Sequence, residues 1–373
     1  MNPEAAVPYP TDRRLYGNTL RCFVGGMLSL ICIAAQAKDP KLDADSIVRQ
    51  FVASREVPGL AVSVGMHGKL YWSAGHGYAD LEQRVAVDPA RTKFRVGSIA
   101  KPITALALVK LVMQERVDLG KDVRVYLPGF PAKEHAFTVG QLAAHLACVR
   151  HYTGDEAYIR KHYASLAEGL DVFSDSPLTC TPGSQWKYSS HGYNLLGAVI
   201  ERASGKPFLD TLEASVFDPL GMQATEADRL DAIVPGRGRY YVRRNGTLHN
   251  EPEVDNSYKW PSGGLLSTTD DLVRFGLAHL EDRHVSAAMR DLLWTEQTAL
   301  DGAKTGYGIG WRIVLDPEGN RWIGHGGGSI GGTTQLWLFP ENGLVIAMAA
   351  NLTDLDYGDI LPRLRALFLE SPR

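Results

Sequence analysis

Residues 94–101 read Phe-Arg-Val-Gly-Ser-Ile-Ala-Lys and place a serine where an extended segment gives way to a helix. Apolar residues at helical spacing follow over 103–112, which predicts a long buried helix from Ser98 onward. Positions i and i+3 share a helix face, so Lys101 can reach the Ser98 hydroxyl. The helix N-terminus adds free backbone N–H groups and positive potential, which favour an oxyanion. A serine and a lysine at this spacing are common, however, and also fit a capping serine beside a solvated lysine.

Strand patterns lie on both sides of this helix. Residues 60–66 and 70–78 predict the two arms of a hairpin, with a turn at His67 and Gly68. Strands return near the C-terminus, separated by short turns. The remaining predicted elements are helices over 43–55, 139–146, 193–203, 270–280 and 358–369, and strands over 309–315, 321–324, 333–339 and 344–350.

Strands at both chain ends and helices between them predict an α/β fold. Its antiparallel sheet is built from both chain ends with flanking helices, and a mainly helical subdomain is inserted. We expect residues 38–373 to form a single domain, with the sheet region at about 44–97 and 262–373 and the helical region at about 98–261.

The composition is that of a soluble globular protein. The 373 residues are 45 % hydrophobic and 22 % charged, which excludes a collagen-like or wholly disordered chain. Lys and Arg number 39 against 42 Asp and Glu, and no basic block is longer than a pair of arginines. We therefore expect no nucleic-acid partner.

Residues 1–37 predict a signal peptide or an N-terminal anchor. The apolar run 22–35 is followed by Ala35-Gln36-Ala37, an A-x-A cleavage pattern. The run is shorter than the roughly 20 residues of a spanning helix, although an uncleaved anchor remains an alternative. The sequence thus predicts a periplasmic or secreted protein with possible membrane anchoring.

Only Cys148 and Cys180 lie outside the predicted signal. Export permits a disulfide between them, but both could equally be buried thiols. The chain has no C-x-x-C pattern, and His145 and His151 do not share a helix face well. We therefore expect neither a metal nor another cofactor.

Two further segments favour a catalytic role for the serine and lysine pair over a structural one. Residues 182–190, Pro-Gly-Ser-Gln-Trp-Lys-Tyr-Ser-Ser, lead into a helix, and residues 324–328, Gly-His-Gly-Gly-Gly, lie on a strand. With S-x-x-K they resemble the serine β-lactamase and penicillin-binding-protein family in its class C-like branch, whose later motifs are Y-x-N and then K-T-G or H-x-G. The likeness is greatest to the branch's mitochondrial members and their bacterial relatives. Its other signatures follow in order at 126–128, 217–222, 262–268 and 307–311.

The resemblance implies a role for each motif residue. Ser98 would be the nucleophile, and Lys101 or Tyr188 would take its proton; the sequence does not choose between these two bases. The backbone N–H groups of Ser98 and Gly328 would form the oxyanion hole. A substrate carboxylate would meet His325, or this histidine would tune the tyrosine and lysine. The substrate-binding residues implied are Ser190, His325, Gly326 and Gly327.

Three segments depart from the family pattern. Ser190 stands where Asn is usual, and residues 146–148, Leu-Ala-Cys, stand where relatives often carry Thr-Ser-Gly. A literal Lys-Thr-Gly at 304–306 precedes the 307–311 signature and is therefore not the third motif, which we assign to His325 and the following glycines. The substitutions at Ser190 and His325 remove groups that would hold a β-lactam.

We therefore expect a serine hydrolase that forms an acyl-enzyme on an amide, peptide, ester or lactam carbonyl. A peptidase or esterase is favoured over an efficient β-lactamase, and the partner would be a small-molecule or peptide substrate. No G-x-S-x-G segment surrounds Ser98, which argues against an α/β-hydrolase. The alternative is a non-catalytic or assembly-forming protein that retains the fold, and a homo-oligomer is possible.

Overall fold

The computed structural model describes residues 39–370. The predicted signal segment, residues 1–37, lies outside the described residues. Within 39–370, no helix is long and apolar enough to cross a bilayer.

A seven-stranded sheet forms the centre of the molecule, in the order β3-β2-β1-β12-β11-β10-β9. All its pairings are antiparallel, and β1 lies against β12, so the two chain ends meet in the middle of the sheet. The predicted fold class is thereby confirmed. The strands are β1 (Gly59–Met66), β2 (Lys69–Asp80), β3 (Val85–Ala86), β9 (Arg312–Leu315), β10 (Arg321–Ser329), β11 (Gly332–Phe339) and β12 (Leu344–Ala350).

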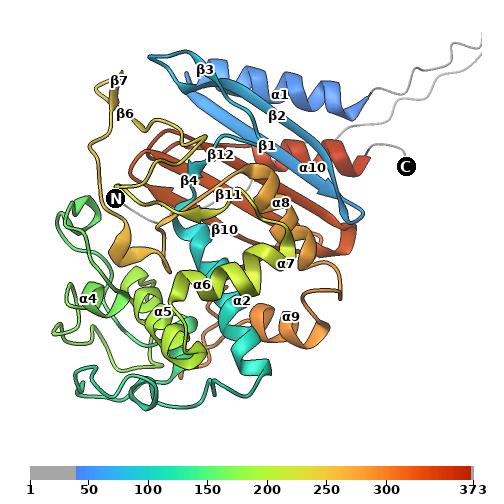
Figure 1. Cartoon of the computed structure of the whole chain (residues 1–373). Helices are drawn as coiled ribbons and strands as arrows, with labels where there is room; N and C mark the ends of the chain where they lie inside the picture. Colours follow the sequence, from blue (N-terminus) through green and yellow to red (C-terminus); the bar gives the residue numbers. More distant parts are fainter. Residues whose placement is uncertain (1–38, 371–373) are drawn as a thin grey trace, which may run out of the picture.

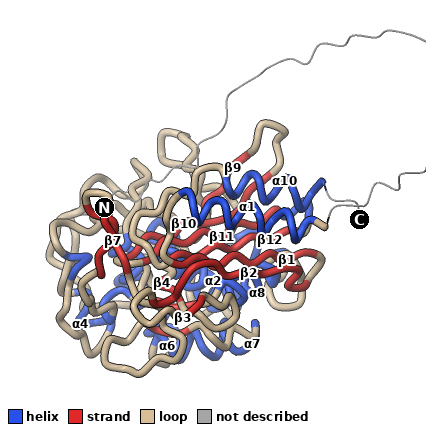
Figure 2. Tube along the Cα trace, turned by 90° about the horizontal axis from the view of Figure 1, so that it is seen from above, coloured by secondary structure: helices blue, strands red, loops and turns tan. Residues whose placement is uncertain are grey.

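Helices cover both faces of this sheet. On one face lie α1 (Pro40–Ser54) and α10 (Ile360–Glu370), and on the other lies α8 (Thr269–Ala278) (Figure 1, Figure 2). Val62 faces the cluster under α1 and α10, whereas Val345 packs toward α8. Because both faces are covered, the central strands are apolar almost throughout instead of alternating.

The helical region is organised around α2 (Ala100–Met113), which Figure 1 shows at its centre. Its residues from Ala100 to Val109 are all buried, which explains why the helix is apolar on every side. The helices around it are α3 (Val139–Ala143), α4 (Leu166–Leu170), α5 (Ser190–Ser204), α6 (Phe208–Leu212), α7 (Asp218–Leu220) and α9 (Ala287–Trp294).

Some predicted elements differ from the structure. The strand expected over 309–315 begins only at Arg312, because Gly310 has a φ of +79° and turns the chain. The helix expected over 139–146 ends at Ala143, since His145 takes the left-handed conformation at φ +61°. The strand expected over 321–324 continues to residue 329.

The region predicted to be mainly helical also contains strands. A three-stranded sheet has the order β4-β8-β5, and a separate hairpin pairs β6 with β7. These strands have only two to four residues, so the sequence shows no recognisable alternation of apolar and polar residues there. They are β4 (Phe94–Arg95), β5 (Glu226–Ala227), β6 (Tyr241–Arg244), β7 (Thr247–Asn250) and β8 (Leu265–Ser267).

Candidate active site

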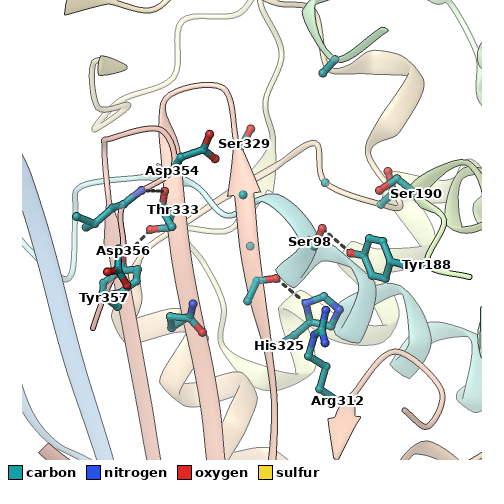
Figure 3. A pocket seen from close by; sticks show the side chains of 18 of the residues that line it. Ser98, Tyr188, Ser190, Arg312, His325, Ser329, Thr333, Asp354, Asp356 and Tyr357 are labelled. Atoms are coloured by element: carbon teal, nitrogen blue, oxygen red, sulfur yellow. Dashed lines mark hydrogen bonds between the residues drawn. The ribbon is translucent and has the colours of Figure 1, made fainter. Parts of the chain in front are cut away.

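Ser98 lies in the short 3-10 turn Gly97–Ile99 that joins β4 to α2. Gly97 has a φ of +52°, and a Cβ there would stand 2.5 Å from the Gly328 carbonyl oxygen. The turn can therefore approach β10 this closely only with glycine at position 97. The result is that Ser98 lies beside the end of β10 that carries the third motif (Figure 3).

Lys101 is fully buried beneath Ser98. Its Nζ lies 3.0 Å from Ser98 Oγ and 3.1 Å from Ser190 Oγ, and it donates a hydrogen bond of 2.8 Å to the Ser262 carbonyl oxygen. Burial, together with the positive charge of Arg312, lowers the pKa of Lys101 well below the ordinary lysine value. The site thus favours a neutral amine next to the serine.

Tyr188 contacts the same serine oxygen from the opposite side. Its hydroxyl donates to Ser98 Oγ at 2.7 Å (Figure 3). Loss of water around the phenol raises the pKa of Tyr188 above the ordinary tyrosine value. A neutral phenol and a buried amine therefore both touch Ser98 Oγ.

The start of α5 places Tyr188 and Ser190. Ser189 caps the helix, its hydroxyl accepting from the Gly192 amide at 2.9 Å, and Ser190 is the first helical residue. Ser190, expected to bind substrate, lines the cavity and also contacts Lys101. The shorter side chain at this position thus still reaches the lysine.

His325 lies on β10 with both ring nitrogens engaged. Nδ1 donates to the Gly326 carbonyl oxygen at 2.6 Å, which leaves Nε2 to accept from the Tyr307 hydroxyl at 3.1 Å. Burial and the nearby Arg312 and Lys101 lower the pKa of His325 well below the ordinary histidine value. The ring is therefore neutral, and in this arrangement neither nitrogen is free for a substrate carboxylate.

The glycines after His325 have different surroundings. A Cβ on Gly327 would stand 2.0 Å from the Val96 carbonyl oxygen, whereas one on Gly328 would meet nothing within 4 Å. A Cβ on Gly326 would come within 3.3 Å of the Gln335 side chain. Gly327 is thus required where β10 packs on the serine turn, and Gly328 leaves open space.

A cavity of about 1080 Å³ opens at Ser98 and is lined by Tyr188, Ser190, His325 and the three glycines. All of the expected site side chains except the buried Lys101 border it. The Lys-Thr-Gly segment at 304–306 is not among its lining residues, and Lys304 points to Glu296 at 3.4 Å.

Arg312 is a lining residue that the sequence analysis missed. It lies opposite Gly324 in the β9–β10 register, which places its side chain next to His325 (Figure 3). Within residues 39–370 its guanidinium has no hydrogen-bond acceptor or carboxylate partner. A cationic residue on the strand just before the third motif is the one sequence feature that points to Arg312. The side on which its side chain lies depends on the pairing of β9 with β10.

The disulfide left open by the sequence is present between Cys148 and Cys180. It joins the loop after α3 to the segment that leads to Tyr188. In the described part of the chain, no group of three or more His, Cys, Asp or Glu side chains could hold a metal ion.

Comparisons with known proteins identify the family of this chain. The family model described as Beta-lactamase matches residues 44–370. The chain belongs to the Beta-lactamase family. It is 30 % identical to the mitochondrial serine beta-lactamase-like protein LACTB of Homo sapiens over 76 % of this chain and 69 % of that protein.

Two penicillin-binding relatives extend the comparison. Penicillin-binding protein 4* of Bacillus subtilis (strain 168) is 28 % identical over 72 % of this chain and 62 % of its own. The octameric penicillin-binding protein homologue from Pyrococcus abyssi superimposes with a TM-score of 0.75 at 25 % identity, over 88 % of this chain and 77 % of that one. The predicted resemblance to the β-lactamase and penicillin-binding-protein family is confirmed.

Proposed function

We propose that this member of the Beta-lactamase family is a serine hydrolase that forms an acyl-enzyme at Ser98. The observation that carries the proposal is the contact of two proton-handling groups with one serine oxygen: Lys101 Nζ at 3.0 Å and Tyr188 Oη at 2.7 Å. A serine hydroxyl is a weak nucleophile until a neighbouring base takes its proton. A capping serine beside a solvated lysine would need neither the burial of the lysine nor the phenol.

We assign Lys101 as the base by counting its hydrogen bonds. A neutral amine has two N–H donors and one lone pair. The Ser262 carbonyl can only accept, so it takes one N–H; the second N–H goes to one serine hydroxyl, and the other hydroxyl donates to the lone pair. We assign that donor as Ser98, because Ser98 Oγ already accepts from Tyr188. The lowered pKa of Lys101 and the raised pKa of Tyr188 agree with an amine that accepts and a phenol that donates.

The acyl transfer then follows from these positions. Ser98 passes its proton to Lys101 Nζ while Oγ attacks the carbonyl carbon, and Tyr188 donates to the oxygen that is losing its proton. When the tetrahedral intermediate collapses, the leaving group takes the proton of Tyr188, and the proton held by Lys101 restores the phenol. Water attacks the ester at Ser98 by the same steps in reverse.

The backbone N–H groups of Ser98 and Gly328 are proposed to bind the oxyanion. The contact between the serine turn and β10 supports this assignment, because Gly97 and Gly327 allow the two segments to approach. One oxyanion donor typically contributes about 3 kcal/mol to the transition state.

Arg312 defines the substrate we propose. It is the cation beside a neutral His325, and its guanidinium has no partner within the described residues. Guanidinium groups bind carboxylates through paired hydrogen bonds. We therefore propose peptides or esters that carry a carboxylate near the scissile bond. β-Lactams carry such a carboxylate too, so their expected poor turnover rests on Ser190 and the neutral His325 and not on Arg312.

A substrate panel tests this function. Nitrocefin, p-nitrophenyl esters with and without a carboxylate, and D-alanyl and L-aspartyl peptides are compared at equal enzyme concentration by kcat/KM. Carboxylate-bearing esters or peptides are expected to exceed nitrocefin. If nitrocefin has the highest kcat/KM, the assignment of His325 and Ser190 to substrate choice is wrong; the paired esters with and without a carboxylate test Arg312.

We also propose export and self-association. The Cys148–Cys180 disulfide supports an oxidising compartment, although the human relative is mitochondrial. The relative from Pyrococcus abyssi is octameric. Cell fractionation and light scattering of the purified protein test the two proposals; recovery in the cytosol, or a monomeric mass, would contradict them.

A further inference from the structure

Two histidines hold the backbone on either side of Tyr188. The Ser189 amide donates to His145 Nδ1 at 3.2 Å, and the Ser190 amide donates to His151 Nδ1 at 3.1 Å. The Lys187 amide donates to the His145 carbonyl oxygen at 2.9 Å. Both neighbours of Tyr188 in the chain are therefore bound to His145.

The partners determine the protonation state of both rings. A backbone amide can only donate, so each Nδ1 must accept and each proton must be on Nε2. His145 Nε2 has no partner within the described residues, so the bond to Ser189 is the only hydrogen bond of that ring. Either ring, once protonated, would turn an N–H toward the amide it now binds.

Burial and the neighbouring basic groups favour this neutral state. Burial lowers the pKa of His145 well below its ordinary value, and Lys101, His325, Arg312 and His151 act in the same direction. Burial likewise lowers the pKa of His151 to about 3. Protonation of His151 would also be opposed by any protonation of Lys101 or His191, whereas the nearby Glu156 favours it.

The same two rings enclose the side chain of Tyr188. The His145 ring centroid lies 4.5 Å from that of Tyr188, and the His151 centroid lies 5.6 Å away at 78°. The loop that carries both histidines is fastened by the disulfide, since Cys148 lies midway between them. Backbone and ring of Tyr188 are thus held by one loop.

We propose that His145 and His151 are positioning residues, which act as neutral hydrogen-bond acceptors to hold the Tyr188 hydroxyl against Ser98. The inference rests on the proposed function, because it assigns a purpose to the Tyr188 contact. Misplacement of a reacting group by about 1 Å can reduce a rate roughly 100-fold. The two histidines therefore control the rate at Ser98 through Tyr188; because His151 also lines the cavity, the test separates the maximal rate from half-saturation.

The test compares two substitutions at each histidine. His145→Leu and His151→Leu remove the acceptor, whereas His145→Asn and His151→Asn can place an amide oxygen where Nδ1 was. Labelling of Ser98 by a fluorophosphonate probe gives the maximal inactivation rate and the probe concentration at half that rate. We expect the leucine variants to lose about 10-fold to 100-fold in the maximal rate with little change in half-saturation, and the asparagine variants to recover most of it.

His279→Leu is the matched control. His279 is buried and binds the Phe275 carbonyl at 2.8 Å, but it lies outside the cavity. We expect it to lower the melting temperature without changing the labelling rate. His151 is half-buried, so its variants keep the test usable should the His145 variants not fold.

Either of two results would overturn the proposal. One is a folded His151→Leu protein that is labelled at the wild-type rate; the other is an asparagine variant as slow as its leucine counterpart. Failure of the proposed function looks different, because the wild-type protein itself would then form no adduct at Ser98.

Discussion

The two walls of the cavity differ in what they contribute. The helical wall carries the side chains proposed to donate or accept protons: Ser98 just before α2 with Lys101 buried behind it, and Tyr188 and Ser190 where the chain enters α5. The sheet wall presents the end of β10, which carries glycines and a neutral His325. In the proposed mechanism, proton transfer is confined to one wall, and the other supplies backbone and space.

This difference predicts how the walls respond to substitution. Side chains that share one proton fail together, because each is useless without the others. Substitution of a β10 glycine should lower activity by changing the geometry, because an added Cβ would push the strand away from the serine turn. Substitutions on each wall test this difference.

The largest effect is expected on the helical wall. Lys101→Met and Tyr188→Phe should each lower kcat/KM by about 100-fold to 10,000-fold, and the double variant should be little worse than either single one. Steady-state kinetics on the best panel substrate measures this. Lys110→Met, on the same helix but bound to the Ser215 carbonyl, is the control. Fully additive losses would mean that the two residues act independently.

On the sheet wall, Gly327→Ala should cost roughly 100-fold in kcat. Its Cβ would stand 2.0 Å from the Val96 carbonyl oxygen, so β10 or the serine turn must shift. Gly129→Ala, whose Cβ would meet nothing within 4 Å, should leave activity unchanged. Wild-type kcat in Gly327→Ala would show that the spacing between the walls is not critical.

Arg312→Met should act mainly on binding when it is measured at a pH above the pKa of Lys101, where loss of the arginine charge leaves that amine neutral. We expect KM for carboxylate-bearing substrates to rise about 10-fold to 100-fold, as loss of a charged hydrogen bond allows, with KM for neutral esters nearly constant. Equal losses for both substrate types would remove the carboxylate role of Arg312.

The pH dependence separates the two proton-handling groups. Only neutral Lys101 accepts a proton, so activity should be lost as the pH falls through its pKa, about tenfold in kcat/KM per pH unit. Because burial lowers that pKa, the acid limb should lie well below the ordinary lysine value. The raised pKa of Tyr188 predicts no loss from the phenol near neutral pH. An acid limb retained in Lys101→Met would assign it to another group.

Local patterns in the sequence predicted much of the fold and site. The hairpin at 60–78, the strands near the C-terminus and the helix after Ser98 carry strong periodicity, and all are present. The two-residue strand β4 (Phe94–Arg95) is too short for any period.

The residues that sequence reasoning missed depend on tertiary contacts. Arg312 reaches the cavity through the register of β9 with β10, and His145 reaches Tyr188 because its left-handed backbone ends α3 early. Neither feature has a local signature. The sequence motifs identified the groups that we propose to react, whereas only the structure identified Arg312 and His145 beside them.

Covalent labelling tests the central claim most directly. The wild-type protein and the Ser98→Ala and Lys101→Met variants are incubated with a fluorophosphonate probe, and the adduct is located by peptide mass spectrometry. We expect one adduct, on Ser98, absent from Ser98→Ala and formed at least about 100-fold more slowly in Lys101→Met. A folded wild-type protein that acquires no adduct on Ser98, or a Lys101→Met protein labelled at the wild-type rate, would contradict the account.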